Sequence, residues 1–134
     1  MKITGQDIVD KAMKMKGKPY IFGYEVKLSD PNPKAFDCSE LVEWVCYQLG
    51  VQPKVPDGSG AQYEHCLEIC LEDAYPTPGA LLFHIGKHVA ISRGDGTTIE
   101  ARGANYGVGV FSATKKRAFN AAGLIPGVTY EGYE

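Results

Sequence analysis

The region from residue 79 to residue 111 of this 134-residue chain contains short runs of β-branched and apolar residues separated by Gly-rich turns. The runs read ALLFH (80–84), HVAIS (88–92), TTIEA (97–101) and YGVGVF (106–111). Strands this short, joined by turns this tight, pair with their neighbours in antiparallel fashion. The second half of the chain is therefore predicted to form an antiparallel meander.

The first half of the chain shows helical patterns instead. Thr4 and Asp7 have the spacing of a capping box, and Gly17 ends the helix that they begin. A second helix has apolar residues along one face over residues 41–49 and closes at Gly50. Both helices are predicted to pack on the sheet.

A third helix is predicted to begin at Ser59, which has capping-box spacing to Gln62. Its apolar face runs on through Cys66 to Cys70, and glutamates occupy the opposite side. Helices followed by strands indicate an α+β fold, and 134 residues suit one domain spanning 1–134.

The composition excludes some partners. The net charge is −2, and no cluster of Lys or Arg suggests a nucleic-acid surface. The N-terminus lacks the apolar core of a signal peptide, and no later stretch is long enough for a membrane span. We therefore expect no nucleic-acid or membrane partner and a protein that is cytoplasmic as made. Without an export signal, the four cysteines are expected to be reduced.

The segment FDCSEL (36–41) gives Cys38 a special position. Asp37 has the character of an N-cap and Glu40 follows three residues later, so Cys38 is predicted to be the first residue of the second helix. The free N–H groups and dipole of a helix N-terminus favour a thiolate and can bind an oxyanion. The alternative is that Cys38 is a small buried residue on the apolar face. The other three cysteines lack a helix-end environment and are expected in the core.

His88 is the candidate base for this cysteine, because it opens a strand of the predicted hairpin. If Gly94–Gly96 form a three-residue loop, Ala90 lies opposite Glu100, and His88 lies opposite Arg102. His88 and Glu100 are then diagonal neighbours on one sheet face, and Glu100 can accept a hydrogen bond from the imidazole. The alternatives are a structural histidine and an exposed Glu100 that pairs with Arg102 or a lysine.

Two sets of residues invite a metal interpretation. His84 and His88 form HxxxH, but there is no HExxH pattern and Gly86 disfavours a helix. His65, Cys66 and Cys70 lack paired CxxC spacing. The sequence thus predicts neither a metal nor a cofactor.

The segments YIFG (20–23), FDCSELV (36–42), GALLFH (79–84) and HVAIS with IEA (88–101) resemble the NlpC family of papain-like cell-wall cysteine peptidases. The resemblance implies a papain-like α+β fold, with N-terminal helices packed on an antiparallel sheet and the catalytic cysteine at a helix N-terminus. It also assigns roles: Cys38 is the nucleophile, His88 the general base and Glu100 the orienting residue.

Further roles follow from the same resemblance. The Tyr20 hydroxyl would border the substrate or oxyanion site, and Asp37 and Ser39 would line the cleft. Two positions depart from the family pattern: Glu40 replaces a common glycine, and Glu100 replaces a common His, Asn or Gln.

The implied substrates are peptidoglycan stem peptides, commonly cut after γ-linked D-glutamate through an acyl-enzyme. The alternatives are an amidase or acyl-transferase activity, or a non-catalytic module that binds the cell wall or belongs to a phage tail. The stretch 99–110 resembles versions from phage tails and prophages, which implies a virion-associated lysin with other phage-tail proteins as partners.

Overall fold

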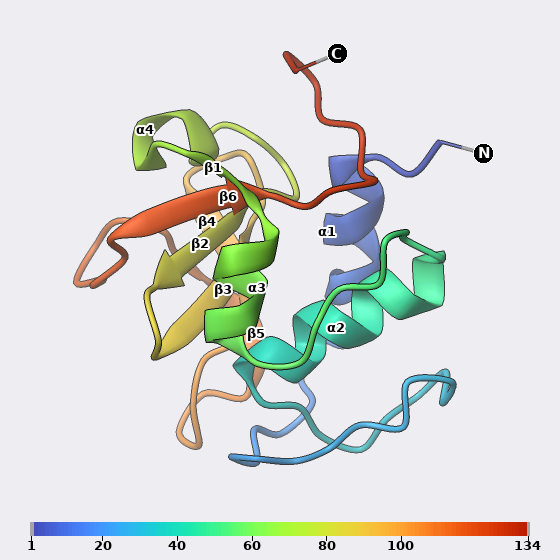
Figure 1. Cartoon of the computed structure of the whole chain (residues 1–134). Helices are drawn as coiled ribbons and strands as arrows, with labels where there is room; N and C mark the ends of the chain where they lie inside the picture. Colours follow the sequence, from blue (N-terminus) through green and yellow to red (C-terminus); the bar gives the residue numbers. More distant parts are fainter. Residues whose placement is uncertain (1, 134) are drawn as a thin grey trace.

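A computed structural model describes residues 2–133. In chain order, its elements are α1 (Gly5–Met13), α2 (Cys38–Leu49), α3 (Ser59–His65), β1 (Leu67–Ile69), α4 (Leu71–Ala74), β2 (Leu81–His84), β3 (His88–Ser92), β4 (Thr97–Ala101), β5 (Val108–Ser112) and β6 (Ala121–Leu124). The α+β prediction is confirmed. Helices α1 and α2 pack against each other and against the central strands β3 and β4 (Figure 1). No helix within residues 2–133 has both the length and the apolar character to cross a membrane.

The six strands form one sheet in the order β1-β6-β2-β3-β4-β5, with antiparallel pairing throughout. The predicted meander is present as β2 to β5. Strand β6 was not predicted, because its sequence AAGL lacks the β-branched residues typical of a strand. It is inserted between β1 and β2, where Gly123 pairs with Leu81 on one side and Glu68 on the other.

The register between β3 and β4 places the candidate histidine and glutamate on one face. Ile91 pairs with Ile99, and the N–H of Arg93 donates to the carbonyl of Thr97 at 2.9 Å, which leaves 94–96 as a three-residue loop. Counting back along the strands puts Ala90 opposite Glu100, as predicted. His88 therefore points to the same side of the sheet as Glu100.

The third predicted helix is wrong in its second half. Helix α3 ends at His65, and Cys66 has extended backbone with ψ of 156°. Leu67–Ile69 then form β1 at the sheet edge, where they hydrogen-bond to β6. Pairing with a distant strand outweighs a short helical pattern, whose propensity differences are small. The predicted cap is also wrong, because Gly58 is the N-cap and no side chain caps the helix.

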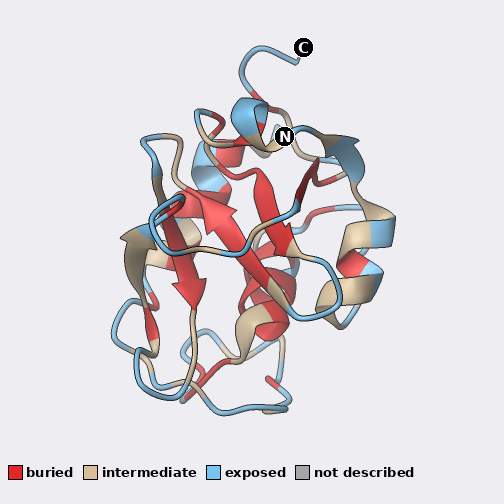
Figure 2. Cartoon of the chain, turned by 90° about the vertical axis from the view of Figure 1, so that its left-hand side faces the viewer, coloured by how far each residue is buried: buried red, intermediate tan, exposed pale blue. Residues whose placement is uncertain are grey.

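Helix α2 is buried over most of its length. Every residue from Ser39 to Cys46 is buried, including Trp44, whose indole N–H donates to the Asp30 carbonyl at 2.8 Å. The sheet covers one side of the helix, and the 20–36 segment and α1 cover others; buried residues line this interior (Figure 2). A helix enclosed in this way holds its first residue, Cys38, in a fixed position relative to β3.

The approach of Gly79 to α1 generates a stability prediction. Gly79 has φ +86°, and a Cβ there would lie 2.4 Å from the Gly5 carbonyl oxygen. Gly79→Ala is therefore expected to lower the free energy of unfolding by about 3 kcal/mol, measured by urea denaturation. Gly86→Ala is the matched control, because Gly86 has φ +78° but no atom near the added carbon. It should cost about 1 kcal/mol; equal losses would contradict the close approach of Gly5 and Gly79.

Candidate active site

Cys38 is the first residue of α2 and is half-buried. Asp37 caps the helix, because its carboxylate accepts a hydrogen bond from the Glu40 N–H at 2.9 Å. The reciprocal bond of the predicted capping box is missing: the Glu40 side chain turns instead toward Glu43 and Asp57. The Glu40 N–H is thus bonded to Asp37, and the N–H groups of Cys38 and Ser39 are the first-turn donors that face a negative charge at this end of the helix.

His88 is held between Cys38 and Glu100. Its Nε2 lies 2.8 Å from Oε1 of Glu100, which leaves Nδ1 for the hydrogen bond with Cys38. Burial opposes protonation, but the hydrogen bonds to Cys38 and Glu100 outweigh it and raise the pKa of His88 to about 9. The imidazole of His88 is therefore protonated beside the sulfur at neutral pH.

Arg117 completes the environment of Glu100 and was missed at the sequence level. Its guanidinium lies 2.5 Å from Oε1 and 3.0 Å from Oε2 of Glu100, and the Thr98 hydroxyl also donates to this carboxylate. Glu100 is fully buried, so the exposed alternative is wrong. Burial alone would raise the pKa of Glu100. The hydrogen bonds from His88, Arg117 and Thr98 outweigh this effect and lower the pKa. A buried carboxylate requires a cation, but spacing alone does not indicate which arginine supplies it.

Phe119 was also not predicted to belong to the site. Its ring stacks on the His88 imidazole at 6.2 Å between centroids, and the Arg117 guanidinium lies 4.5 Å from the same ring. The loop between β5 and β6 thus fixes both the imidazole and the carboxylate that orients it.

Tyr20 lies next to the Cys38 end of α2. A parallel bridge joins Tyr20 to Phe36, and the N–H of Phe36 donates to the Pro19 carbonyl at 3.1 Å. Burial, together with the negative charges of Cys38 and Asp37, raises the pKa of Tyr20. The hydroxyl therefore stays protonated and available as a donor near the sulfur.

Asp37 and Ser39 are on either side of Cys38, as the sequence requires. Asp37 accepts hydrogen bonds from the Gly23 N–H at 3.3 Å and from the Ser39 hydroxyl at 3.4 Å. Ser39 is buried, and its hydroxyl holds the Asp37 carboxylate by this hydrogen bond. Asp37 in turn ties the loop after Tyr20 to the start of α2.

Three carboxylates meet on the other side of the first turn of α2. Ligand oxygens of Glu40, Glu43 and Asp57 lie within 4.8 Å of one another, and Lys54 lies 3.7 Å from Glu43. Burial, and then repulsion from Glu43 and Asp57, raises the pKa of Glu40 to about 8. Glu40 therefore carries a proton at neutral pH. Within residues 2–133, neither His/Cys set considered for zinc forms a comparable cluster.

The four cysteines are free, and their environments differ. Cys46 is buried, as predicted, and Cys66 packs partly against the core. The expectation of a position away from helix ends is wrong for Cys66, which forms the C-cap of α3, and for Cys70, which is exposed and forms the N-cap of α4. The reason is the break at Cys66, which removes the helix face that would have buried Cys70.

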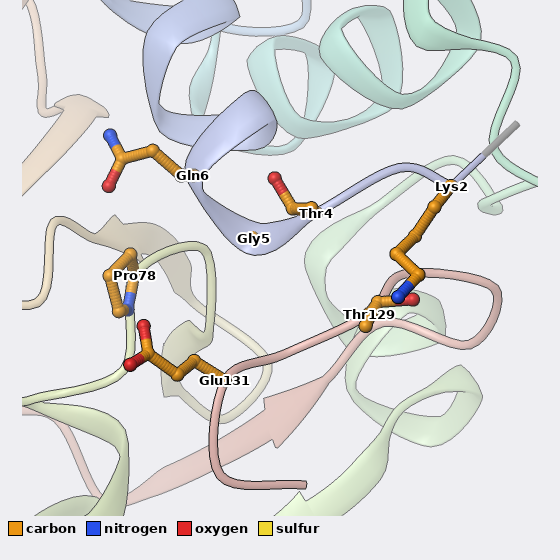
Figure 3. A pocket seen from close by; sticks show the side chains of 7 residues that line it. All are labelled: Lys2, Thr4, Gly5, Gln6, Pro78, Thr129 and Glu131. Carbon is orange, nitrogen blue, oxygen red and sulfur yellow. The ribbon is translucent and has the colours of Figure 1, made fainter. Parts of the chain in front are cut away.

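A pocket of about 320 Å³ lies away from these residues, between the start of α1, Pro78 and the C-terminal segment. Figure 3 shows Lys2 and Thr129 at one side of it and Pro78 and Glu131 at the other. No residue that lines it belongs to α2, β3 or β4, and it offers no cysteine or histidine. Cys38 and His88 are therefore not part of this pocket.

The NlpC/P60 family matches residues 17–122, a range that contains Cys38, His88 and Glu100. The chain belongs to the NlpC/P60 family. A probable endopeptidase of Corynebacterium glutamicum is 35% identical over 98 residues, covering 73% of this chain and 43% of the relative. A probable endopeptidase of Mycobacterium tuberculosis is 30% identical over 103 residues, covering 77% of this chain and 24% of the relative. The chain thus spans less than half the length of these curated relatives.

Solved structures of the NlpC/P60 family share the fold. The NlpC/P60 domain of the peptidoglycan hydrolase SagA superposes with a TM-score of 0.77 at 29% identity, covering 92% of this chain and 100% of that domain. The peptidoglycan hydrolase RipB of Mycobacterium tuberculosis gives a TM-score of 0.75 at 27% identity, covering 90% of this chain and 64% of that chain. The predicted papain-like fold is confirmed.

The His88–Glu100 pair generates a prediction for pH dependence. Because the pKa of His88 rises from 6.5 to about 9, its proton stabilises the fold fully below about pH 6.5, and this contribution is lost as the pH rises through about 9. Glu100→Gln removes the charge that favours imidazolium, so the titration of His88, followed by NMR, should shift to lower pH. Asp95→Asn, in the exposed hairpin loop, is the control; a His88 titration unmoved by Glu100→Gln would contradict the pairing.

The carboxylate cluster generates a second prediction. The pKa of Glu40 rises from 4.5 to about 8, so the folded state is progressively disfavoured as the pH rises between these values. Glu40→Gln keeps the shape without the charge and should raise Tm by several degrees at pH 8.5, with little gain at pH 5. The exposed Glu64→Gln is the control and should change Tm little at either pH. A gain that is the same at both pH values would refute proton binding by Glu40.

Proposed function

We propose that this domain is a cysteine peptidase that hydrolyses stem-peptide bonds of peptidoglycan. The observation that carries the proposal is the hydrogen-bonded series Cys38, His88 and Glu100, which begins at a helix N-terminus and ends on a buried carboxylate. Relatives are named probable endopeptidases, and SagA and RipB are named peptidoglycan hydrolases. These names support the proposal. Action at the bacterial cell wall belongs to the same proposal, and association with phage-tail proteins stays a prediction.

In the first half of the reaction, the Cys38 thiolate attacks the scissile carbonyl carbon. The oxyanion that forms accepts hydrogen bonds from the first-turn N–H groups of α2 and from the Tyr20 hydroxyl. The His88 imidazolium then gives its proton to the leaving nitrogen, the C–N bond breaks, and the acyl group remains on sulfur as a thioester.

In the second half, neutral His88 takes a proton from water, and the resulting hydroxide attacks the thioester. The C–S bond breaks, which releases a carboxylic acid and restores the thiolate and imidazolium. Glu100 stabilises the imidazolium at each stage, and Arg117 keeps Glu100 ionised. A carboxylate at position 100 therefore supports the same cycle as the neutral residues common in the family.

We place the cut after γ-linked D-glutamate, following the sequence resemblance. A digest of purified peptidoglycan, with the fragments identified by mass spectrometry, tests the bond directly. Fragments with a new amine on the third stem residue are expected. Release of whole stem peptides from the glycan would instead identify an amidase, and transfer to an added amine would identify an acyl transferase. An unchanged digest would overturn the proposal.

Cys38→Ala should reduce the rate of fragment release by at least about 10³-fold, because no other group replaces the nucleophile. Cys70→Ser is the matched control: Cys70 is an exposed thiol at the N-cap of α4, where serine is also a good cap. The control should release fragments at the wild-type rate. Equal activity of Cys38→Ala and wild type would exclude Cys38 as the nucleophile.

A further inference from the structure

Three carboxylates converge beside the first turn of α2, and two of them are buried. Glu40 and Glu43 are 6% and 7% exposed, whereas Asp57, shortly before α3, is exposed. One oxygen of each lies within 4.8 Å of the others. Within residues 2–133, the one ion pair of this cluster joins Glu43 to Lys54 at 3.7 Å, and the lysine side chain is 65% exposed. Because it is costly to bury carboxylates so close together, the cluster calls for more positive charge than Lys54 supplies.

The amide of Gln62 is a second, independent feature of the same place, and it is fully buried. Its Nε2 donates to the carbonyls of Ser39 and Pro56, both at 3.0 Å. These carbonyls directly precede Glu40 and Asp57 in the chain, so the amide is held between the two segments that carry the cluster. Both amide protons are used, but Oε1 has no hydrogen-bond partner in the part of the chain that the structure describes. A buried oxygen left unsatisfied is costly, and a cation, or a water bound to it, would satisfy it.

All the ligand atoms that this place offers are oxygens. Three carboxylates and an amide carbonyl form a hard set of ligands, which is typical of Ca²⁺ and unlike the nitrogen and sulfur ligands of zinc. Two oxygens on opposite sides of a Ca²⁺ ion lie about 4.6–5.2 Å apart, and the carboxylate oxygens of the cluster fall within that span. A cavity of about 370 Å³, lined by Glu43 and Lys54, gives a hydrated cation a path to the cluster and leaves room for water ligands.

We propose that Glu40, Glu43 and Asp57 bind a Ca²⁺ ion, with Oε1 of Gln62 as a further ligand, directly or through one water. The ion takes the place of Lys54 at Glu43 and joins the first turn of α2 to the segment before α3. Mg²⁺ binds more weakly, because it gives up its water ligands reluctantly and two of the carboxylates are buried. The family commonly has glycine at position 40, so the complete ligand set belongs to this chain and is independent of the proposed peptidase activity.

Calcium binding to the metal-free chain tests the site directly. After treatment with a chelator, titration calorimetry at about pH 7.5 should give a Kd for Ca²⁺ of about 10⁻⁴ M. About 5 mM Ca²⁺ should raise Tm by about 5 °C relative to EDTA, and the same concentration of Mg²⁺ should raise it less. The absence of both heat and a Tm shift with Ca²⁺ would overturn the proposal. A larger shift with Zn²⁺ than with Ca²⁺ would indicate nitrogen or sulfur ligands and overturn it as well.

Substoichiometric Mn²⁺, a paramagnetic ion that also prefers oxygen ligands, locates the bound cation by NMR. The amide signals of residues 40–43 and 57–58 should broaden first, and excess Ca²⁺ should restore them. Exposed glutamates of the α3–α4 region provide the internal comparison: Glu64, Glu68 and Glu72. Preferential broadening around these residues would show an adventitious ion only, bound at the surface, and would refute the site.

Matched variants separate coordination from general charge. Glu43→Gln and Asp57→Asn should each weaken Ca²⁺ binding at least about tenfold. In EDTA both variants should be at least as stable as wild type, because repulsion is relieved, so a lost response to Ca²⁺ is not a failure to fold. Lys54→Gln should tighten binding about threefold, because it removes the cation that competes for Glu43. Glu64→Gln removes one exposed charge elsewhere and should bind Ca²⁺ as wild type does; weakening equal to that of Glu43→Gln would refute the site.

Discussion

The buried carboxylate of Glu100 is the group on which the arrangement of the site depends. A fully buried carboxylate is costly unless cations and hydrogen-bond donors surround it, and removing one partner of such a pair is strongly destabilising. Here Arg117, Thr98 and His88 all contact it. The same contacts that make burial of Glu100 tolerable also hold the imidazole toward Cys38. Folding of the sheet and assembly of the site are therefore one event.

The parts of the site that follow from local sequence could be predicted. The helix start at Cys38 follows from the Asp37 cap, and the pairing of His88 with Glu100 follows from counting along a hairpin with a three-residue loop. Both depend on residues close in sequence. Tyr20 and the cleft residues came only from the family resemblance, and their roles in the reaction remain predictions.

The parts that were missed depend on contacts distant in sequence. Arg117 and Phe119 reach the site from a loop with no regular sequence pattern. Strand β6 forms because β1 and β2 hydrogen-bond to it on either side. The break at Cys66 has the same origin. Residues 67–69 pair with β6 as strand β1 instead of continuing the helix, and Cys70 is therefore exposed to solvent. Helical periodicity over a dozen residues does not contain that information.

The β5–β6 loop contributes to several properties of the site at once. Arg117 is the counter-ion of Glu100 and, two residues on, Phe119 supplies the ring that stacks on His88. A change in this loop would therefore disturb the basicity of His88 together with the burial of Glu100. Insertions here are constrained as well, because a shift of one residue would move Arg117 away from Glu100. Relatives that differ at position 100 are expected to have changed this loop as a block, and not one residue at a time.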